Sequence, residues 1–119
     1  MTMLRKLIGK KVVKISYINT ATTSIDKKEG IMVESPISIV FEDYTLNIYN
    51  PFTIKGTDTD ASLRIIENLT VIDCQEQPTE VTIELETNIE LAIDLKDESF
   101  QGPEALSLYG PNNLIIVWN

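Results

Sequence analysis

The sequence contains no histidine and only one cysteine, Cys74, among its 119 residues. Without histidine, Ser-His-Asp and Cys-His mechanisms, histidine-bearing zinc sites and the commonest general base are excluded. A lone cysteine cannot form an internal disulfide, which agrees with a reducing compartment. The neighbouring carboxylates Asp73 and Glu76 would raise the pKa of this thiol, the wrong direction for a nucleophile. Cys74 is therefore predicted to be a small strand residue.

Long apolar runs and glycine-rich loops are also missing. The longest apolar segments, residues 37–41 and 114–118, are far shorter than the roughly 20 residues of a transmembrane helix. The start, MTMLRKLIGKK, lacks the apolar region of a secretory signal, which predicts a cytoplasmic location. The five glycines are scattered and form no phosphate-binding loop. We therefore expect no enzymatic activity, no cofactor and no metal, with acid–base catalysis by two carboxylates as the enzymatic alternative.

Positive charge is nearly missing from the second half of the chain, and the formal net charge is −8. Residues 1–64 contain nine Lys or Arg against seven Asp or Glu, a balance of +2. Residues 65–119 contain only Lys96 against eleven Asp or Glu, a balance of −10. A field of this sign opposes binding to nucleic acid or to anionic membranes and speeds association with basic partners. The expected partner is therefore a basic protein.

The pattern that is present has a period of two, and helical periodicity is nearly absent. Strands are predicted over residues 11–18, 37–42, 45–50, 69–75, 80–85, 89–95, 104–109 and 114–119. A short N-terminal helix is possible, and Asp60 is predicted to cap one or two helical turns. Residues 20–30 are predicted to be a polar loop that ends at Gly30. We expect one all-β domain over residues 1–119, an antiparallel β-sandwich or open barrel of about eight strands.

An internal similarity links two distant segments. Residues 7–16 read LIGKKVVKIS and residues 65–74 read IIENLTVIDC, and a predicted hairpin follows each. The similarity predicts two similar β units, whereas the short period of solenoid repeats is absent.

The segment EVTIELETNIELAIDL, residues 80–95, combines strict apolar alternation with a high density of negative charge. It contains no basic residue and five carboxylates, those of Glu80, Glu84, Glu86, Glu90 and Asp94. These five residues are the candidate partner-binding site.

Strand pairing predicts which of these carboxylates face each other. If residues 85 and 89 pair across a three-residue loop, Asn88 occupies a left-handed position, which asparagine tolerates. Glu84 then faces Glu90, and Glu80 faces Asp94, on the side away from the core. Each like-charge pair should cost about 0.2–1 kcal/mol, and neither strand contains a cation to relieve it.

Three interpretations of this face remain open. The face is solvated or partly neutralised by an N-terminal cluster of cations, Arg5, Lys6, Lys10, Lys11 and Lys14. Alternatively, it docks a basic partner, because like charges on a rigid sheet steer association and complementary contacts convert repulsion into specificity. The third interpretation is a metal or catalytic carboxylate site, although the segment lacks the Asp-x-Asp-x-Asp-Gly pattern of calcium loops.

The last predicted strand, LIIVW at residues 114–118, is apolar on both faces, which predicts burial on both faces. If it is exposed instead, Tyr109, Ile116 and Trp118 form an apolar patch of the kind that marks interfaces. A structural or self-associating module that uses this strand is the alternative to electrostatic docking. A small-ligand site in the mouth of a barrel is a third possibility.

The C-terminal segment QGPEALSLYGPNNLIIVWN contains Gly-Pro-Glu-Ala at residues 102–105 and an apolar run that ends in Val-Trp at residues 117–118. It resembles the closing hairpin of small bacterial β proteins with the same pattern. Proteins of this sort resemble the immunity proteins of bacterial toxin systems, including contact-dependent growth inhibition. The resemblance covers the final fifth of the chain. It implies a small, acidic, non-enzymatic protein that binds one cognate toxin domain, frequently a basic nuclease.

Overall fold

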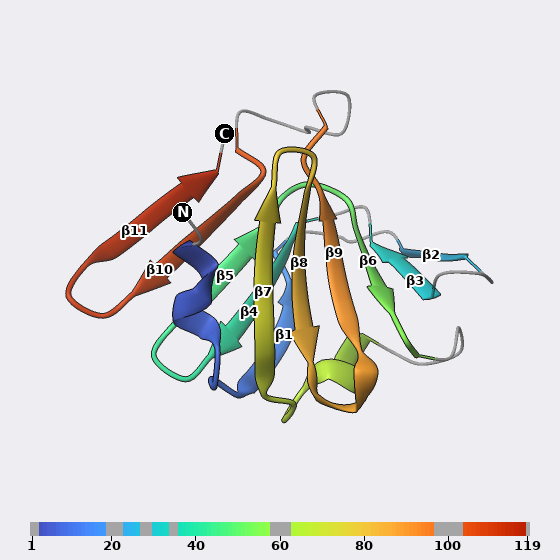
Figure 1. Cartoon of the computed structure of the whole chain (residues 1–119), viewed down its shortest axis with the longest axis horizontal. Helices are drawn as coiled ribbons and strands as arrows, with labels where there is room; N and C mark the ends of the chain where they lie inside the picture. The colour runs from blue at the N-terminus through green and yellow to red at the C-terminus, as the bar shows by residue number, and fades with distance from the viewer. Residues whose placement is uncertain are drawn as a thin grey trace.

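The computed structural model describes residues 3–18, 23–26, 30–33, 36–57, 63–96 and 104–118. Two antiparallel sheets pack face to face (Figure 1). One has five strands, in spatial order β1 (Val12–Tyr17), β4 (Ile37–Phe41), β5 (Thr45–Ile48), β10 (Leu106–Gly110) and β11 (Leu114–Trp118). The other has six, β2 (Thr23–Asp26), β3 (Gly30–Val33), β6 (Phe52–Lys55), β9 (Glu90–Asp94), β8 (Glu80–Leu85) and β7 (Val71–Gln77). The prediction of an all-β sandwich is confirmed.

Three short 3₁₀ helices complete the described part of the chain, η1 (Met3–Leu7), η2 (Leu63–Ile66) and η3 (Glu86–Asn88). The first two correspond to the predicted N-terminal helix and to the helical turns expected after Asp60, a cap that lies outside the described residues. None of the helices in the described ranges has the length and apolar character needed to cross a membrane.

The described residues form eleven strands, three more than the sequence predicts. Strands β2 and β3 fall within residues 20–30 and just after them, where a polar loop was expected, and β6 follows Pro51. Each has only four residues. Four residues are too few to show a period of two, and β6 is recognisable only by its pairing with β3 and β9.

The core lies between the two sheets, because each strand turns alternate residues inward. In the hairpin of β4 and β5 the inward residues are buried: Ile39, Phe41, Leu46 and Ile48. In the hairpin of β8 and β9 the inward residues are also buried: Val81, Ile83, Leu91 and Ile93. Helix η1 packs beside β7 (Figure 1) and adds Leu4 and Leu7, both 0% exposed.

The two predicted β units form the halves of the fold. In each half a 3₁₀ helix precedes a residue with left-handed backbone, Gly9 (φ 86°) or Asn68 (φ 71°). A strand with an early register shift follows, β1 or β7. A hairpin comes next, β8–β9 directly after β7 and β4–β5 after the inserted strands β2 and β3. The halves meet through matching bonds, since Gly9 N donates to Val71 O and Asn68 N donates to Val12 O, each at 2.8 Å.

The halves also exchange strands, since β2, β3 and β6 of the first half lie in the sheet of β7, β8 and β9, and β10 and β11 of the second half lie in the sheet of β1, β4 and β5. Strand β6 follows β5 in the chain but pairs with β9 of the other half. Strand β10 follows β9 but pairs with β5. Strands β1, β4, β5 and β10 of one sheet therefore correspond to β7, β8, β9 and β6 of the other.

Candidate functional site: an acidic sheet face

The hairpin of β8 and β9 has the predicted register. Glu80 lies opposite Asp94, and Glu84 lies opposite Glu90. Asn88 is left-handed with φ 64°, as the three-residue loop requires. Four of the five candidate carboxylates therefore come together on the outer side of the six-stranded sheet.

Neighbouring strands extend these pairs into two rows across the sheet. The first row runs from β7 to β6 and consists of Asp73, Glu84, Glu90 and Lys55. The second row consists of Gln77, Glu80 and Asp94. We call the outer surface of β7, β8 and β9 the acidic face, and its carboxylates are those of Asp73, Glu80, Glu84, Glu90 and Asp94.

Asp73 was missed as a site residue by the sequence analysis. It lies directly opposite Glu84, immediately after the register shift that separates it from Val71. In a regular ladder Asp73 would lie opposite the residue two positions away from the partner of Val71. The register shift places Asp73 only one position away, opposite Glu84, and the alternation of the sequence does not show such an irregularity. The row therefore contains three consecutive carboxylates where the sequence indicated two.

The fifth candidate, Glu86, lies apart from the acidic face. Its Oε1 accepts the backbone N–H of Thr70 at 2.8 Å, and its own N–H donates to Thr70 O at 3.1 Å. Glu42 makes the same two contacts with Lys11 in the first half, at 3.0 and 3.2 Å. The repetition shows that Glu86 has a structural role, because it ties the loop of the β8–β9 hairpin to the residue before β7 in its own half.

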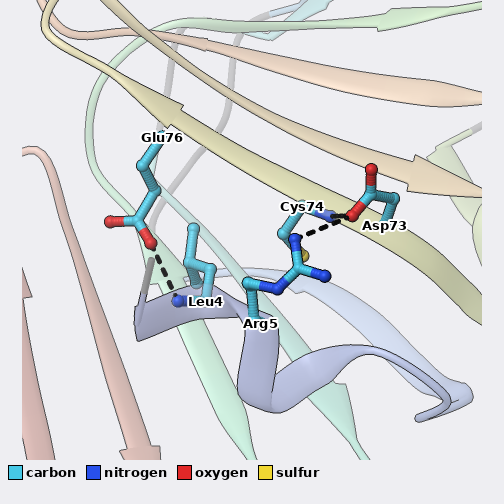
Figure 2. A network of polar contacts seen from close by, with 5 residues as sticks. All are labelled: Leu4, Arg5, Asp73, Cys74 and Glu76. Carbon is cyan, nitrogen blue, oxygen red and sulfur yellow. Dashed lines mark hydrogen bonds and ion pairs between the residues drawn. The ribbon is translucent and has the colours of Figure 1, made fainter. Parts of the chain in front are cut away.

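Only one of the five N-terminal cations forms an ion pair with the acidic face within the described ranges. Arg5 Nη1 lies 3.3 Å from Asp73 Oδ1, at the β7 end of the first row (Figure 2). Lys10 Nζ instead lies 3.5 Å from Asp43 Oδ2. Lys14 belongs to β1 of the other sheet. Neutralisation by the N-terminal cations, one part of the first interpretation, therefore reaches the edge of the face and not its centre.

Two lysines outside that cluster border the rows. Lys55 of β6 is in register with Glu90, and Lys96 Nζ lies 4.0 Å from Asp94 Oδ2. Over the ranges that the structure describes, no ion pair is formed by the remaining carboxylates, Glu80, Glu84 and Glu90.

The five-stranded sheet provides an internal comparison for the first row. The equivalent positions on β1, β4, β5 and β10 hold Lys14, Val40, Thr45 and Tyr109. Three acids and one lysine give the acidic row a charge of −2, whereas its counterpart has +1. The same strand arrangement forms in both sheets, so the fold does not require carboxylates at these positions.

The carboxylates lie side by side and do not gather around one point. Over the described ranges, no group of three or more His, Cys, Asp or Glu side chains could hold a metal ion. No family model, curated protein or solved structure matches the chain. The chemistry of the acidic face is therefore inferred from its own residues.

Small side chains separate the two acidic rows. Thr82 of β8 pairs with Ala92 of β9 between them. A hollow of about 60 Å³ lies beside the first row, and a larger one of about 210 Å³ extends past Ala92 toward Glu80 and Asp94. Both are open to solvent, and a side chain of another protein could enter them.

The inward side of β7 has a structural role. Cys74 is 1% exposed, and burial, followed by the charges of Asp73 and Glu76, raises the pKa of its thiol to about 12. Glu76 accepts the N–H of Leu4 at 3.0 Å (Figure 2) and the indole N–H of Trp118 at 2.7 Å. Cys74 is thus the inert strand residue that was predicted, and Glu76 is a structural clasp between η1 and β11.

The prediction that the last strand is buried on both faces is wrong. Pairing with β10 places Ile116 and Trp118 on the side of the core, where both are half-buried. The exposed residues are Tyr109, Ile115 and Val117, at 37%, 62% and 39%. The apolar patch therefore lies on the outer face, and its residues differ from the predicted set except for Tyr109.

Proposed function

We propose that this chain is a non-enzymatic protein-binding domain whose acidic face docks a basic protein. Most concretely, it is an immunity protein that neutralises a basic, nuclease-like toxin. The observation that carries the proposal is the pair of carboxylate rows, in which Glu80, Glu84 and Glu90 lack an ion pair within the described ranges. Carboxylates fixed on a sheet attract a basic partner over a distance and increase its association rate.

The internal comparison supports the proposal. Like charges directly opposite each other cost about 0.2–1 kcal/mol per pair. The equivalent row of the five-stranded sheet avoids this cost with Lys14, Val40 and Thr45. A partner's cation near Glu84 and Glu90 is attracted to both carboxylates and offsets the repulsion between them. An acidic surface would add to that repulsion, so the face selects basic partners.

The shape of the face suits long cationic side chains. The aliphatic stems of lysine and arginine pack on apolar or small residues while their charged ends reach acceptors. Ala92 and Thr82 would take the stems, and the rows on either side would take the charged ends. Lys55 and Lys96 line the other side of the larger hollow and would repel a cation placed there, which favours the side of Glu80 and Asp94.

The test compares two doubly substituted proteins with equal net charge. The combination Glu84→Gln and Glu90→Gln removes two charges from the acidic face, and the combination Asp43→Asn and Glu104→Gln removes two charges elsewhere. Each protein and the wild type are immobilised and exposed to lysate of the source cells, and bound proteins are eluted with salt up to about 1 M, where the Debye length is about 3 Å.

A basic protein retained by the wild type and the control but lost from the acidic-face variant supports docking by this face. Equal retention by both variants contradicts it. The immunity function is then tested by producing the retained protein in cells. Growth inhibition that this chain relieves, and that the acidic-face variant does not relieve, is the expected result. A retained protein without toxicity overturns the immunity function and leaves the docking face intact.

A further inference from the structure

Among the residues that the structure describes, strand β11 forms an unprotected edge of the five-stranded sheet. In the described part of the chain it pairs only with β10. Exposed edges are usually protected by lysine, proline or a bulge, because their free backbone groups can pair with another strand. The sequence of β11, LIIVW, contains none of these residues, and Ile115 is 62% exposed.

The six-stranded sheet shows what the equivalent edge looks like when a further strand is present. Strand β3 lies beside β6 as β11 lies beside β10, and β2 continues the sheet beyond β3 in antiparallel orientation. Ile31 and Val33 of β3 are 4% and 0% exposed. Their counterparts on β11, Ile116 and Trp118, remain half-buried. Among the described residues, the five-stranded sheet has no strand in the position that β2 occupies.

The backbone of β11 shows which groups point outward. Trp118 O accepts the N–H of Ala105 at 2.7 Å and therefore points toward β10. In an antiparallel strand the N–H and C=O of one residue point to the same side, and successive residues alternate. The N–H and C=O groups of Ile115 and Val117 consequently point away from β10.

We propose that this edge pairs with β11 of a second copy of the chain, antiparallel and about a two-fold axis at Ile116. In this register Ile115 lies opposite the partner's Val117, and the two such pairs exchange four backbone hydrogen bonds. The resulting dimer contains one continuous sheet of ten strands. The interface is isologous, so one surface meets itself and the assembly closes as a dimer.

The absence of charge on β11 favours a second copy of the chain as the partner. Residues 114–118 carry no charge, whereas the chain as a whole has −8. The acidic face belongs to the other sheet, so two copies can join at β11 without bringing carboxylate rows together. A basic protein would find no acidic group on this strand, and an apolar strand is complementary to itself.

The first test is the mass of the protein by analytical ultracentrifugation over a range of concentration, at low salt and at about 1 M salt. The expected result is a monomer–dimer equilibrium that salt leaves unchanged or strengthens. Ile115→Lys combined with Val117→Lys should abolish the dimer, because charges would face each other across the axis. The control replaces apolar residues of similar exposure, Val13 at 55% and Ile72 at 51%, by lysine and should retain it. A monomer at every concentration, or equal loss in both variants, overturns the proposal.

A cysteine substitution tests the register itself. Ile116 meets the partner's Ile116 at a non-hydrogen-bonded pair, where the Cα atoms are about 4.5 Å apart, a separation that a disulfide can span. Ile116→Cys should give a covalent dimer on oxidation, and Ile115→Cys should not. Cys74 does not interfere, since it is 1% exposed. Equal crosslinking of the two variants would show that another register, or another surface, joins the copies.

Discussion

Replacing Glu84 by glutamine should increase the free energy of unfolding. Glu84 is the central residue of the first acidic row, with Asp73 opposite on β7 and Glu90 opposite on β9. Glutamine has nearly the same size and keeps the position on the outer face, but it removes the charge. One substitution therefore eliminates two repulsive pairs.

The magnitude follows from those two pairs. At about 0.2–1 kcal/mol each, they give a gain of about 0.4–2 kcal/mol, and because Glu84 is exposed we expect about 0.5–1 kcal/mol. Glu90→Gln removes one repulsive pair but also the attraction of Lys55, so its effect should be close to zero. Glu86→Gln should destabilise the protein, because the hydrogen bond from Thr70 loses its charge assistance.

Urea unfolding at pH 7 measures the three variants against the wild type, at about 20 mM and about 1 M salt. The gain of Glu84→Gln should shrink as salt rises, while the loss in Glu86→Gln should largely remain. A Glu84→Gln protein that is no more stable than the wild type at low salt would refute the reasoning. So would a gain that salt does not change.

Two further predictions concern the inward side of β7. Glu76→Ala removes the acceptor of the Leu4 N–H and of the Trp118 indole N–H, and it should lower the free energy of unfolding by about 2–4 kcal/mol. Glu76→Gln should lower it by less. Urea unfolding, followed by the fluorescence of the single tryptophan, measures both variants. The Cys74 thiol stays protonated in the folded state up to a pKa of about 12, whereas in the unfolded chain it ionises near 9.0. Its contribution to stability is therefore constant below pH 9 and falls by about 1.4 kcal/mol per pH unit above it. Cys74→Ala should remove this part of the alkaline decline, and parallel curves for the two proteins would contradict the assignment.

The hairpin of β8 and β9 could be predicted from the sequence because all of its determinants are local. Apolar residues alternate over both strands, and the three residues between them include Asn88, which accepts the left-handed backbone. Together these features determine the register, and the register determines which carboxylates face each other. The same local logic identified the hairpin of β4 and β5.

Features that depend on distant segments could not be predicted. Asp73 and Lys55 join the acidic row because β7 and β6 lie on either side of the hairpin, and no local pattern gives that order. The N-terminal cations were grouped by their closeness in sequence, yet only Arg5 forms an ion pair with the row in the described structure. The edge position of β11 is likewise a property of the whole sheet, since apolar residues on both sides of a strand look the same whether a further strand covers them or not.

The exchange of β6 and β10 has a consequence for how the domain folds. Each half contributes strands to the sheet of the other, so neither half forms a complete sheet in isolation. The pairs of β5 with β10 and of β6 with β9 join residues far apart in the sequence, and loop closure must precede the contacts that reward it. Folding should consequently be slow for a chain of this size and proceed in a single cooperative step. A fragment that ends before β10 would lack β11 as well, would expose β5 as the edge of its sheet and would be prone to aggregate.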